Sequence, residues 1–254
     1  QLLVSYSIVI SSFSHLGSPH ILIRYFPKFK NKDELITFLF VLCLFGFILF
    51  SSSFFLLKDY LLSTFDFSPL FSENFHLLVG FVFSLMFFDL FNSVSRSYLD
   101  STTPIFLNEV YLRIITLFLL VAYHFLLIDF TNFLWLYLFS YFSKLVFLFI
   151  IQLFKKQIRL CFKWGGVDFN QIRYGLYVIL GSGAAILVSR IDMIMIDYFL
   201  DLKHVAYYGL AFFIGSVIKV PGRSLSSIST PLISKAFEEN DTNQIVQIYK
   251  KTSI

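Results

Sequence analysis

Seven apolar runs, each of twenty residues or more, constrain the fold of this chain more than any other feature of its sequence. They cover residues 2–23, 35–57, 75–94, 105–128, 133–154, 174–200 and 205–233. A helix of about 20 apolar residues crosses the hydrocarbon core of a bilayer. Lipid offers the backbone no hydrogen-bond partner, so a spanning run must be a helix or a strand of a closed barrel. These runs are too long for barrel strands and do not alternate, which predicts an all-α polytopic membrane protein with seven spans.

The composition supports this fold class. The chain is 57% hydrophobic and 14% charged, whereas a soluble domain carries about 45–50% apolar and about 25% charged residues. This excess excludes a soluble enzyme, a secreted disulfide scaffold and a disordered tail. The net charge of +4 fits basic residues beside membrane spans better than a nucleic-acid partner. Cys43 lies in an apolar run and Cys161 in a basic connection, so we expect two free thiols.

The lysines and arginines predict how the spans are oriented. Fourteen of the twenty lie at alternate span junctions, namely Arg24, Lys28, Lys30, Lys32, Arg96, Lys155, Lys156, Arg159, Lys163, Arg173, Arg223, Lys235, Lys250 and Lys251. Only Lys58 and Lys203 lie at the other junctions. Because basic residues accumulate on the cytoplasmic side of membrane proteins, the first set is expected to be cytoplasmic and Gln1 to lie outside.

The longest cytoplasmic link between two spans suggests a boundary between two lobes. We predict an N-terminal lobe at residues 1–154, a cytoplasmic inter-lobe loop at 155–173 and the start of a C-terminal lobe at 174–254. The chain opens on Gln1 rather than Met and is apolar from Leu2 onward. We therefore expect it to be an internal piece of a longer protein, with one span before it and further helices after it.

Local signals predict bends and a helix start. Pro19 follows Gly17 inside the first run, and Pro221 interrupts the last one, so both are expected to bend their helices and to act as hinges. Thr103 directly precedes Pro104, which predicts an N-cap at Thr103 with proline in the first helical position.

The polar segment near the end of the chain has the pattern of an interfacial helix. Asp241 is a suitable N-cap, and Ile245, Ile248 and Tyr249 recur at i, i+3 and i+4 behind it. This spacing predicts a short amphipathic helix that lies on the membrane surface or leads to another span.

Charged residues inside the spans are the candidate functional residues. A charge at the bilayer centre costs about 2.5–3.5 kcal/mol on insertion scales, so each should face a polar cavity or a partner. The cations are Arg113, Lys144, Arg190 and Lys219, and the acids are Asp89, Glu109, Asp192 and Asp197. The deep cations exceed the deep acids Asp89 and Asp192, which suits an anionic ligand such as a phosphate.

Pairing between these charges is the structural alternative. Glu109 and Arg113 have the i,i+4 spacing of a helical ion pair that neutralises itself. Asp192 points away from Arg190 and needs a partner on another helix, for which Lys219 is one candidate. Arg24 lies at a span end, where it serves either orientation or substrate binding.

Catalytic and metal-binding patterns are scarce. The five histidines are scattered, and the sequence contains no HExxH motif, no P-loop and no GxSxG motif. The sequence therefore predicts no metal site, no cofactor, no catalytic residues and no enzymatic activity.

The chain resembles a family of polysaccharide-biosynthesis flippases, the Wzx-type O-antigen transporters of the multidrug/oligosaccharidyl-lipid/polysaccharide exporter superfamily. GSPH at residues 17–20 and RYFP at 24–27 are similar to the end of that family's second helix. SRID at 189–192 and DYFL at 197–200 resemble the seventh helix, and VAYYGLA at 205–211 continues into the eighth. PLISK at 231–235 is similar to the cytoplasmic end of that helix.

The resemblance implies two six-helix lobes around a central cationic cavity in a bacterial inner membrane. It implies movement of a polyprenyl-pyrophosphate-linked oligosaccharide, such as an O-antigen or lipopolysaccharide unit, to the outer leaflet by alternating access. A polysaccharide polymerase and glycosyltransferases would be partners. We expect Arg24, Arg113, Lys144 and Arg190 to contact the substrate. Asp89, Asp192, Asp197 and Lys219 would serve ion coupling or charge pairing.

Three other functions remain open. A drug/cation antiporter of the same superfamily would need a net acidic cavity. A membrane-embedded glycan polymerase or glycosyltransferase would present catalytic acids or arginines in a large outer loop, whereas residues 58–74 offer only Asp59, Asp66 and Glu73. A scaffolding membrane protein would tolerate a neutral replacement of Arg190.

Overall fold

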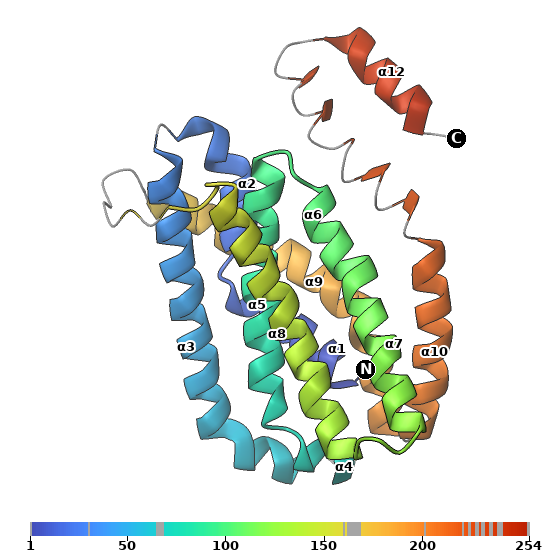
Figure 1. The fold of residues 1–254 in the computed structure, drawn as a ribbon. Helices are drawn as coiled ribbons and strands as arrows, with labels where there is room; N and C mark the ends of the chain where they lie inside the picture. Colours follow the sequence, from blue (N-terminus) through green and yellow to red (C-terminus); the bar gives the residue numbers. More distant parts are fainter. Residues whose placement is uncertain are drawn as a thin grey trace.

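A computed structural model describes residues 2–29, 31–64, 69–159, 161, 169–200, 202–219, 221–222, 225–226, 229, 232–233, 236–237 and 241–252. Every regular element in these residues is a helix, which confirms the all-α prediction (Figure 1). The helices are α1 (Leu2–Ser14), α2 (Ser18–Tyr25), η1 (Phe26–Lys28), α3 (Lys32–Thr64), α4 (Pro69–Glu73), α5 (Leu77–Ser97), α6 (Thr102–Ile105), the π-helix η2 (Phe106–Tyr111), α7 (Leu112–His124), α8 (Phe130–Phe154), α9 (Phe169–Phe199), α10 (Leu202–Ile218) and α12 (Thr242–Thr252).

Five stretches of helix are long and apolar enough to cross a membrane. They are Lys32–Lys58, Leu77–Ser97, Thr102–His124, Phe130–Phe154 and Asn170–Phe199. This makes the chain a multi-pass membrane protein. The first predicted span is divided between α1 and α2, and the last is represented by α10, whose seventeen residues end at Ile218. Much of the predicted inter-lobe loop, at residue 160 and residues 162–168, lies outside the described part, and α9 begins before residue 174.

The bend predicted at Pro19 is present and has a clear cause. Helix α1 ends at Ser14, Gly17 has φ of +75°, and α2 begins at Ser18 with Pro19 in its first turn. This left-handed backbone is easily adopted only by glycine. A Cβ on Gly17 would also lie 2.6 Å from backbone atoms of Gly175 in α9. Gly17 therefore breaks the first span where it crosses α9.

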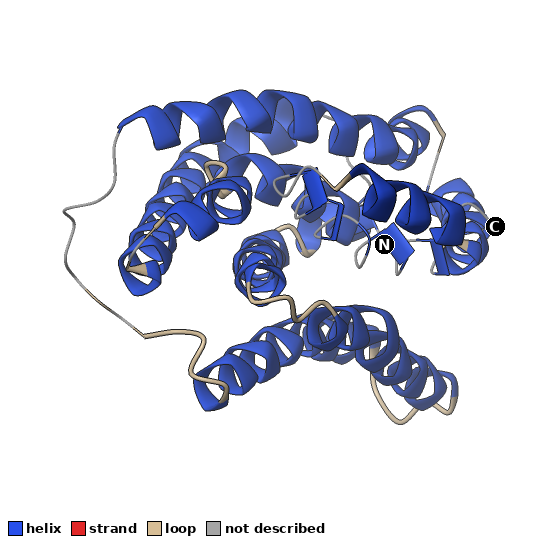
Figure 2. Ribbon diagram, turned by 90° about the horizontal axis from the view of Figure 1, so that it is seen from above, coloured by secondary structure: helices blue, strands red, loops and turns tan. Residues whose placement is uncertain are grey.

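Helix α5 lies inside the bundle of helices that Figure 2 shows from above. Fourteen of its residues are buried, and it packs against α1, α2, α3 and α8. Gln152 of α8 donates hydrogen bonds to the backbone oxygen of Phe91 and to Oγ of Ser95, at 2.6 and 2.7 Å. Helix α7, in contrast, contains no buried residue within the described structure. Several of its large apolar side chains, among them Ile114 and Phe118, are exposed, which suits contact with lipid.

The connections rich in lysine and arginine meet at one end of the bundle, the upper end in Figure 1. Lys155 after α8 forms an ion pair with Asp100 after α5, at 2.5 Å. The Nζ atom of Lys32, at the start of α3, lies 5.7 Å from the ring centroid of Tyr98. Lys30, Lys163, Arg223 and Lys235 of the basic set lie outside the described residues.

Two predicted helix caps have different outcomes. The cap at Thr103 is wrong, because α6 begins at Thr102 and the carboxylate of Asp100 accepts hydrogen bonds from both the backbone N–H and the hydroxyl of Thr103. The cap at Asp241 is confirmed, since its Oδ1 accepts from the backbone N–H of Gln244 at 3.0 Å, at the start of α12. Cys43 and Cys161 are free, as predicted.

Candidate functional site

A cavity of about 500 Å³ brings together three of the four cations that the sequence placed inside spans. Seven elements contribute to its wall, from α1 to α10. The lining residues are Val4, Ser5, Ile8, Leu85, Asn108, Glu109, Leu112, Arg113, Thr116, Leu117, Leu120, Tyr137, Tyr141, Lys144, Arg190, Met193, Leu210, Phe212, Phe213 and Ser216. We call this space the cationic cavity.

Lys144 is the most deeply buried of these cations. It lies near the middle of α8 and is 1% exposed. Its ammonium donates a hydrogen bond to Oδ1 of Asn108 at 2.8 Å, and it lies 4.2 Å from the ring centroid of Phe88 and 4.7 Å from that of Tyr141. An amide oxygen and two aromatic faces stabilise the charge without neutralising it. The carboxylates of Asp89 and Glu109 lie near enough to interact electrostatically with Lys144.

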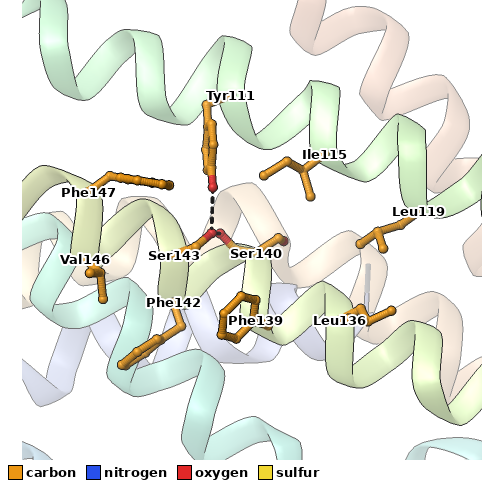
Figure 3. A pocket seen from close by; sticks show the side chains of 10 residues that line it. All are labelled: Tyr111, Ile115, Leu119, Leu136, Phe139, Ser140, Phe142, Ser143, Val146 and Phe147. Carbon is orange, nitrogen blue, oxygen red and sulfur yellow. Dashed lines mark hydrogen bonds between the residues drawn. The ribbon is translucent and has the colours of Figure 1, made fainter.

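Asn108 is a residue that sequence reasoning missed, and its position depends on a π-helical segment. The six residues of η2 have π-helical hydrogen bonding, a rare geometry that is often found at functional sites. The hydroxyls of Tyr111 and Ser143 form a second hydrogen bond between η2 and α8, at 2.9 Å (Figure 3). Helical periodicity in the sequence cannot reveal such a segment, because it depends on the tertiary contacts with α8.

Figure 3 also shows the side chains that line a hollow around this hydrogen bond. This hollow of about 460 Å³ between η2–α7 and α8 is lined almost wholly by apolar side chains. The hydroxyls of Tyr111 and Ser143 are hydrogen-bonded to each other inside this hollow. The hollow therefore resembles a lipid-facing groove rather than a polar binding site.

The ion pair predicted between Glu109 and Arg113 is confirmed. Their side chains meet at 2.6 Å, and both are partly exposed to the cationic cavity. The guanidinium carbon of Arg113 lies 5.3 Å from the ring centroid of Phe213 in α10. Glu109 is the only acid among the described lining residues, so its charge offsets one cation out of three.

Arg190 of α9 is the third cation that lines the cationic cavity. Its guanidinium carbon lies 5.1 Å from the ring centroid of Phe212, the neighbour of the aromatic residue beside Arg113. Three elements therefore each present a cation to one space, and two adjacent phenylalanines of α10 lie against two of them. The cavity carries a formal excess of positive charge.

The other predicted site residues are not among the described residues that line the cationic cavity. Arg24 is exposed at the basic end of the bundle, with its guanidinium carbon 4.1 Å from the ring centroid of Tyr174. Asp89 is exposed on α5, and Asp197 lines a different cavity. Lys219 and Pro221 are exposed beyond the end of α10.

Asp192 has a partner other than the lysine suggested by the sequence. The hydroxyl of Tyr208 in α10 donates to its Oδ2 at 2.8 Å. Lys219 follows Tyr208 by eleven residues, which is about 16 Å along a helix axis. The requirement for a partner on another helix was right, but that partner is a neutral tyrosine.

Comparison of the chain with protein-family models, with curated protein sequences and with solved structures finds no match in any of the three.

Proposed function

We propose that this protein is a bacterial inner-membrane transporter, not an enzyme, that moves a polyprenyl-pyrophosphate-linked oligosaccharide to the outer leaflet by alternating access. The observation that carries the proposal is the convergence of Arg113, Lys144 and Arg190 on one cavity within a bundle of apolar helices. Cations at this depth are costly. Their convergence is explained if an anionic group occupies the space between them.

The chemistry of the three cations suits a pyrophosphate. Arginine offers a planar fork of donors that matches phosphate oxygens, and lysine offers a compact point charge. A diphosphate presents several acceptor oxygens and so can engage cations from three helices at once. Glu109 already pairs with Arg113, so an entering phosphate would compete with this carboxylate for the same guanidinium.

The proposal includes the predicted architecture of seven spans and two lobes. Residues 1–154 would form the N-terminal lobe, and residues 174–254 would begin the C-terminal one. The break at Gly17 and Pro19 would allow the first span to bend as the lobes move. The fixed partner of Asp192, Tyr208, would hold α9 and α10 together during that motion, and Asp89 would tune the charge near Lys144.

The charge of the cavity favours an anionic substrate over the two main alternatives. An antiporter of organic cations would need net negative charge where this cavity has three cations and one acid. A membrane-embedded glycosyltransferase would need catalytic acids or arginines near a water-filled entrance. The cations here lie among helices instead.

The test is a binding measurement on the purified protein in detergent. A polyprenyl-pyrophosphate oligosaccharide should bind at least tenfold more tightly than a neutral polyprenyl glycan. Arg190→Ala should remove most of this preference. Arg173→Ala is the matched control, because Arg173 is an exposed arginine on the same helix outside the cavity. Equal binding of the two lipids, or equal effects of the two substitutions, would contradict the proposal.

A further inference from the structure

Another cavity lies between α1, α3, α5 and α9. Its volume is about 660 Å³, within the range of small-molecule sites. Its lining residues are Tyr6, Ile10, Phe50, Ser53, Phe54, Leu57, Phe75, Leu78, Ile191, Ile194, Met195, Asp197, Tyr198 and Phe199. We call it the Asp197 cavity. The described lining contains no lysine or arginine. The charge of this described lining is negative, whereas the described lining of the cationic cavity is net positive.

Asp197 is the one charged group among the described lining residues. It is 8% exposed, and its Oδ1 atom is buried without a hydrogen-bond partner among the described residues. An ionised carboxylate in such surroundings carries a large desolvation cost unless a positive charge or a donor compensates it. Oδ1 of Asp197 is thus an acceptor for which the described residues supply no donor.

The rest of the described wall combines aromatic and aliphatic side chains. Six of the fourteen lining side chains are aromatic, among them Phe54 and Phe75, which stack with ring centroids 4.9 Å apart. Aromatic faces attract organic cations through the ring quadrupole, and aromatic side chains recur in recognition sites for quaternary ammonium groups.

We propose that the Asp197 cavity binds an amphipathic organic cation, with its positive centre on Asp197 and its apolar body against the aromatic wall. The composition of the wall excludes the other classes of ligand. An anion would meet no cation. A divalent metal ion would find one carboxylate where six or more oxygens are usual for calcium. A neutral acyl chain would leave the carboxylate uncompensated. This site goes beyond the proposed glycolipid transport and does not depend on it.

Tetraphenylphosphonium is a suitable probe, because it is a permanent cation with four aromatic rings. Binding of the radiolabelled probe to the protein in lipid nanodiscs would be measured against empty nanodiscs. We expect saturable binding that Asp197→Asn weakens at least tenfold. Asp197→Glu, which keeps the charge, should retain affinity within about threefold. Neutral triphenylphosphine oxide should compete at least tenfold more weakly than unlabelled tetraphenylphosphonium.

Asp192→Asn is the matched control, because Asp192 lies on the same helix but outside the cavity. It should change probe affinity less than twofold, and so should Arg190→Ala in the cationic cavity. Leu57→Lys provides a second variant that does not depend on the carboxylate. Leu57 is 49% exposed at the cavity wall and precedes Lys58, so the added charge is tolerated by the fold and should repel the probe.

Equal affinity of Asp197→Asn and Asp192→Asn would overturn the proposal, as would equal competition by the neutral analogue. A loss of glycolipid binding in Arg190→Ala without loss of tetraphenylphosphonium binding would separate this site from the proposed transport site. Failure of the glycolipid assay alone would leave the cation site standing.

Discussion

The two cavities share helix α9 but differ in charge and in the residues of their walls. Arg190 faces the cationic cavity, and Asp197, seven residues later on α9, faces the Asp197 cavity. Seven residues are about two turns, so the two side chains have similar directions around the axis but are separated by about 10 Å along it. One helix can therefore serve two sites of opposite charge because its neighbours change along its length. Charge alone, without the contacts, would have assigned both residues to one site.

The largest effect that tests this contrast is expected from Lys144→Met, which removes a buried cation and keeps the volume of the side chain. Binding of the pyrophosphate lipid should fall by between about tenfold and a hundredfold, since a hydrogen bond to a charged group contributes about 1.5–3 kcal/mol. The thermal midpoint should change little, because removal of the desolvation cost of the buried ammonium is offset by the loss of the hydrogen bond to Oδ1 of Asn108. Isothermal titration and thermal unfolding in detergent would check both results. A lower midpoint with unchanged binding would assign Lys144 a structural role only.

Gly17→Ala tests whether the position of α9 depends on the break in the first span. We expect a loss of about 2 kcal/mol or more in unfolding free energy, because the left-handed conformation costs a non-glycine residue about 1–2 kcal/mol and the new Cβ would meet Gly175 at 2.6 Å. Gly181→Ala is the control, since a Cβ there meets no described atom within 4 Å. That variant should be neutral or slightly more stable, because alanine is the better helix former. Chemical unfolding in mixed micelles would measure the difference.

Asn108→Ala tests how the fixed charge of the cationic cavity is held in place. It removes the amide oxygen that accepts from Lys144 and should destabilise the protein by about 1–3 kcal/mol, the cost of an unsatisfied buried polar group. Asn132→Ala, at an exposed position near the start of α8, should change stability by less than about 0.5 kcal/mol. A similar effect of both substitutions would show that the contact with Lys144 does not stabilise the fold.

The smallest effect is expected outside both cavities, at the ion pair of Asp100 and Lys155. Burial alone would raise the pKa of Asp100, but hydrogen bonds from Lys155 and Thr103 more than offset it and hold the pKa below its ordinary value. The unfolded chain therefore binds the proton more tightly, and the stabilisation is present above about pH 4 and is lost as the pH falls further. Because the pair is partly exposed, Asp100→Asn should cost less than about 1 kcal/mol at pH 7. Unfolding curves of the variant and the unaltered protein should converge below about pH 3.

Sequence reasoning predicted the helical class correctly and singled out three cations, Arg113, Lys144 and Arg190, that line one cavity. In lipid, a long apolar run can form all of its backbone hydrogen bonds within itself only as a helix. The break at Gly17 follows from the ability of glycine to adopt positive φ. The pair of Glu109 and Arg113 follows from helical spacing alone. Long-range contacts were harder to foresee. Tyr208 as the partner of Asp192 and Asn108 as the partner of Lys144 depend on how α10 and η2 pack, which periodicity does not encode. Asp197 was assigned to ion coupling or charge pairing, and the separate cavity that it lines depends on how α1 and α3 lie beside α9.

The π-helical segment η2 also determines which insertions and deletions the cationic cavity tolerates. A π turn contains one residue more than an α turn, and one residue corresponds to about 100° of rotation about the helix axis. Deletion of a single residue from Phe106–Tyr111 can therefore be absorbed by closing the wide π turn to an α turn, which leaves Arg113 directed toward Lys144 and Arg190. The same deletion in the regular turns of α7 would rotate every residue that follows it by about 100°. In evolutionary terms, a one-residue length change is tolerated in the π-helical segment and not in the regular helix beside it.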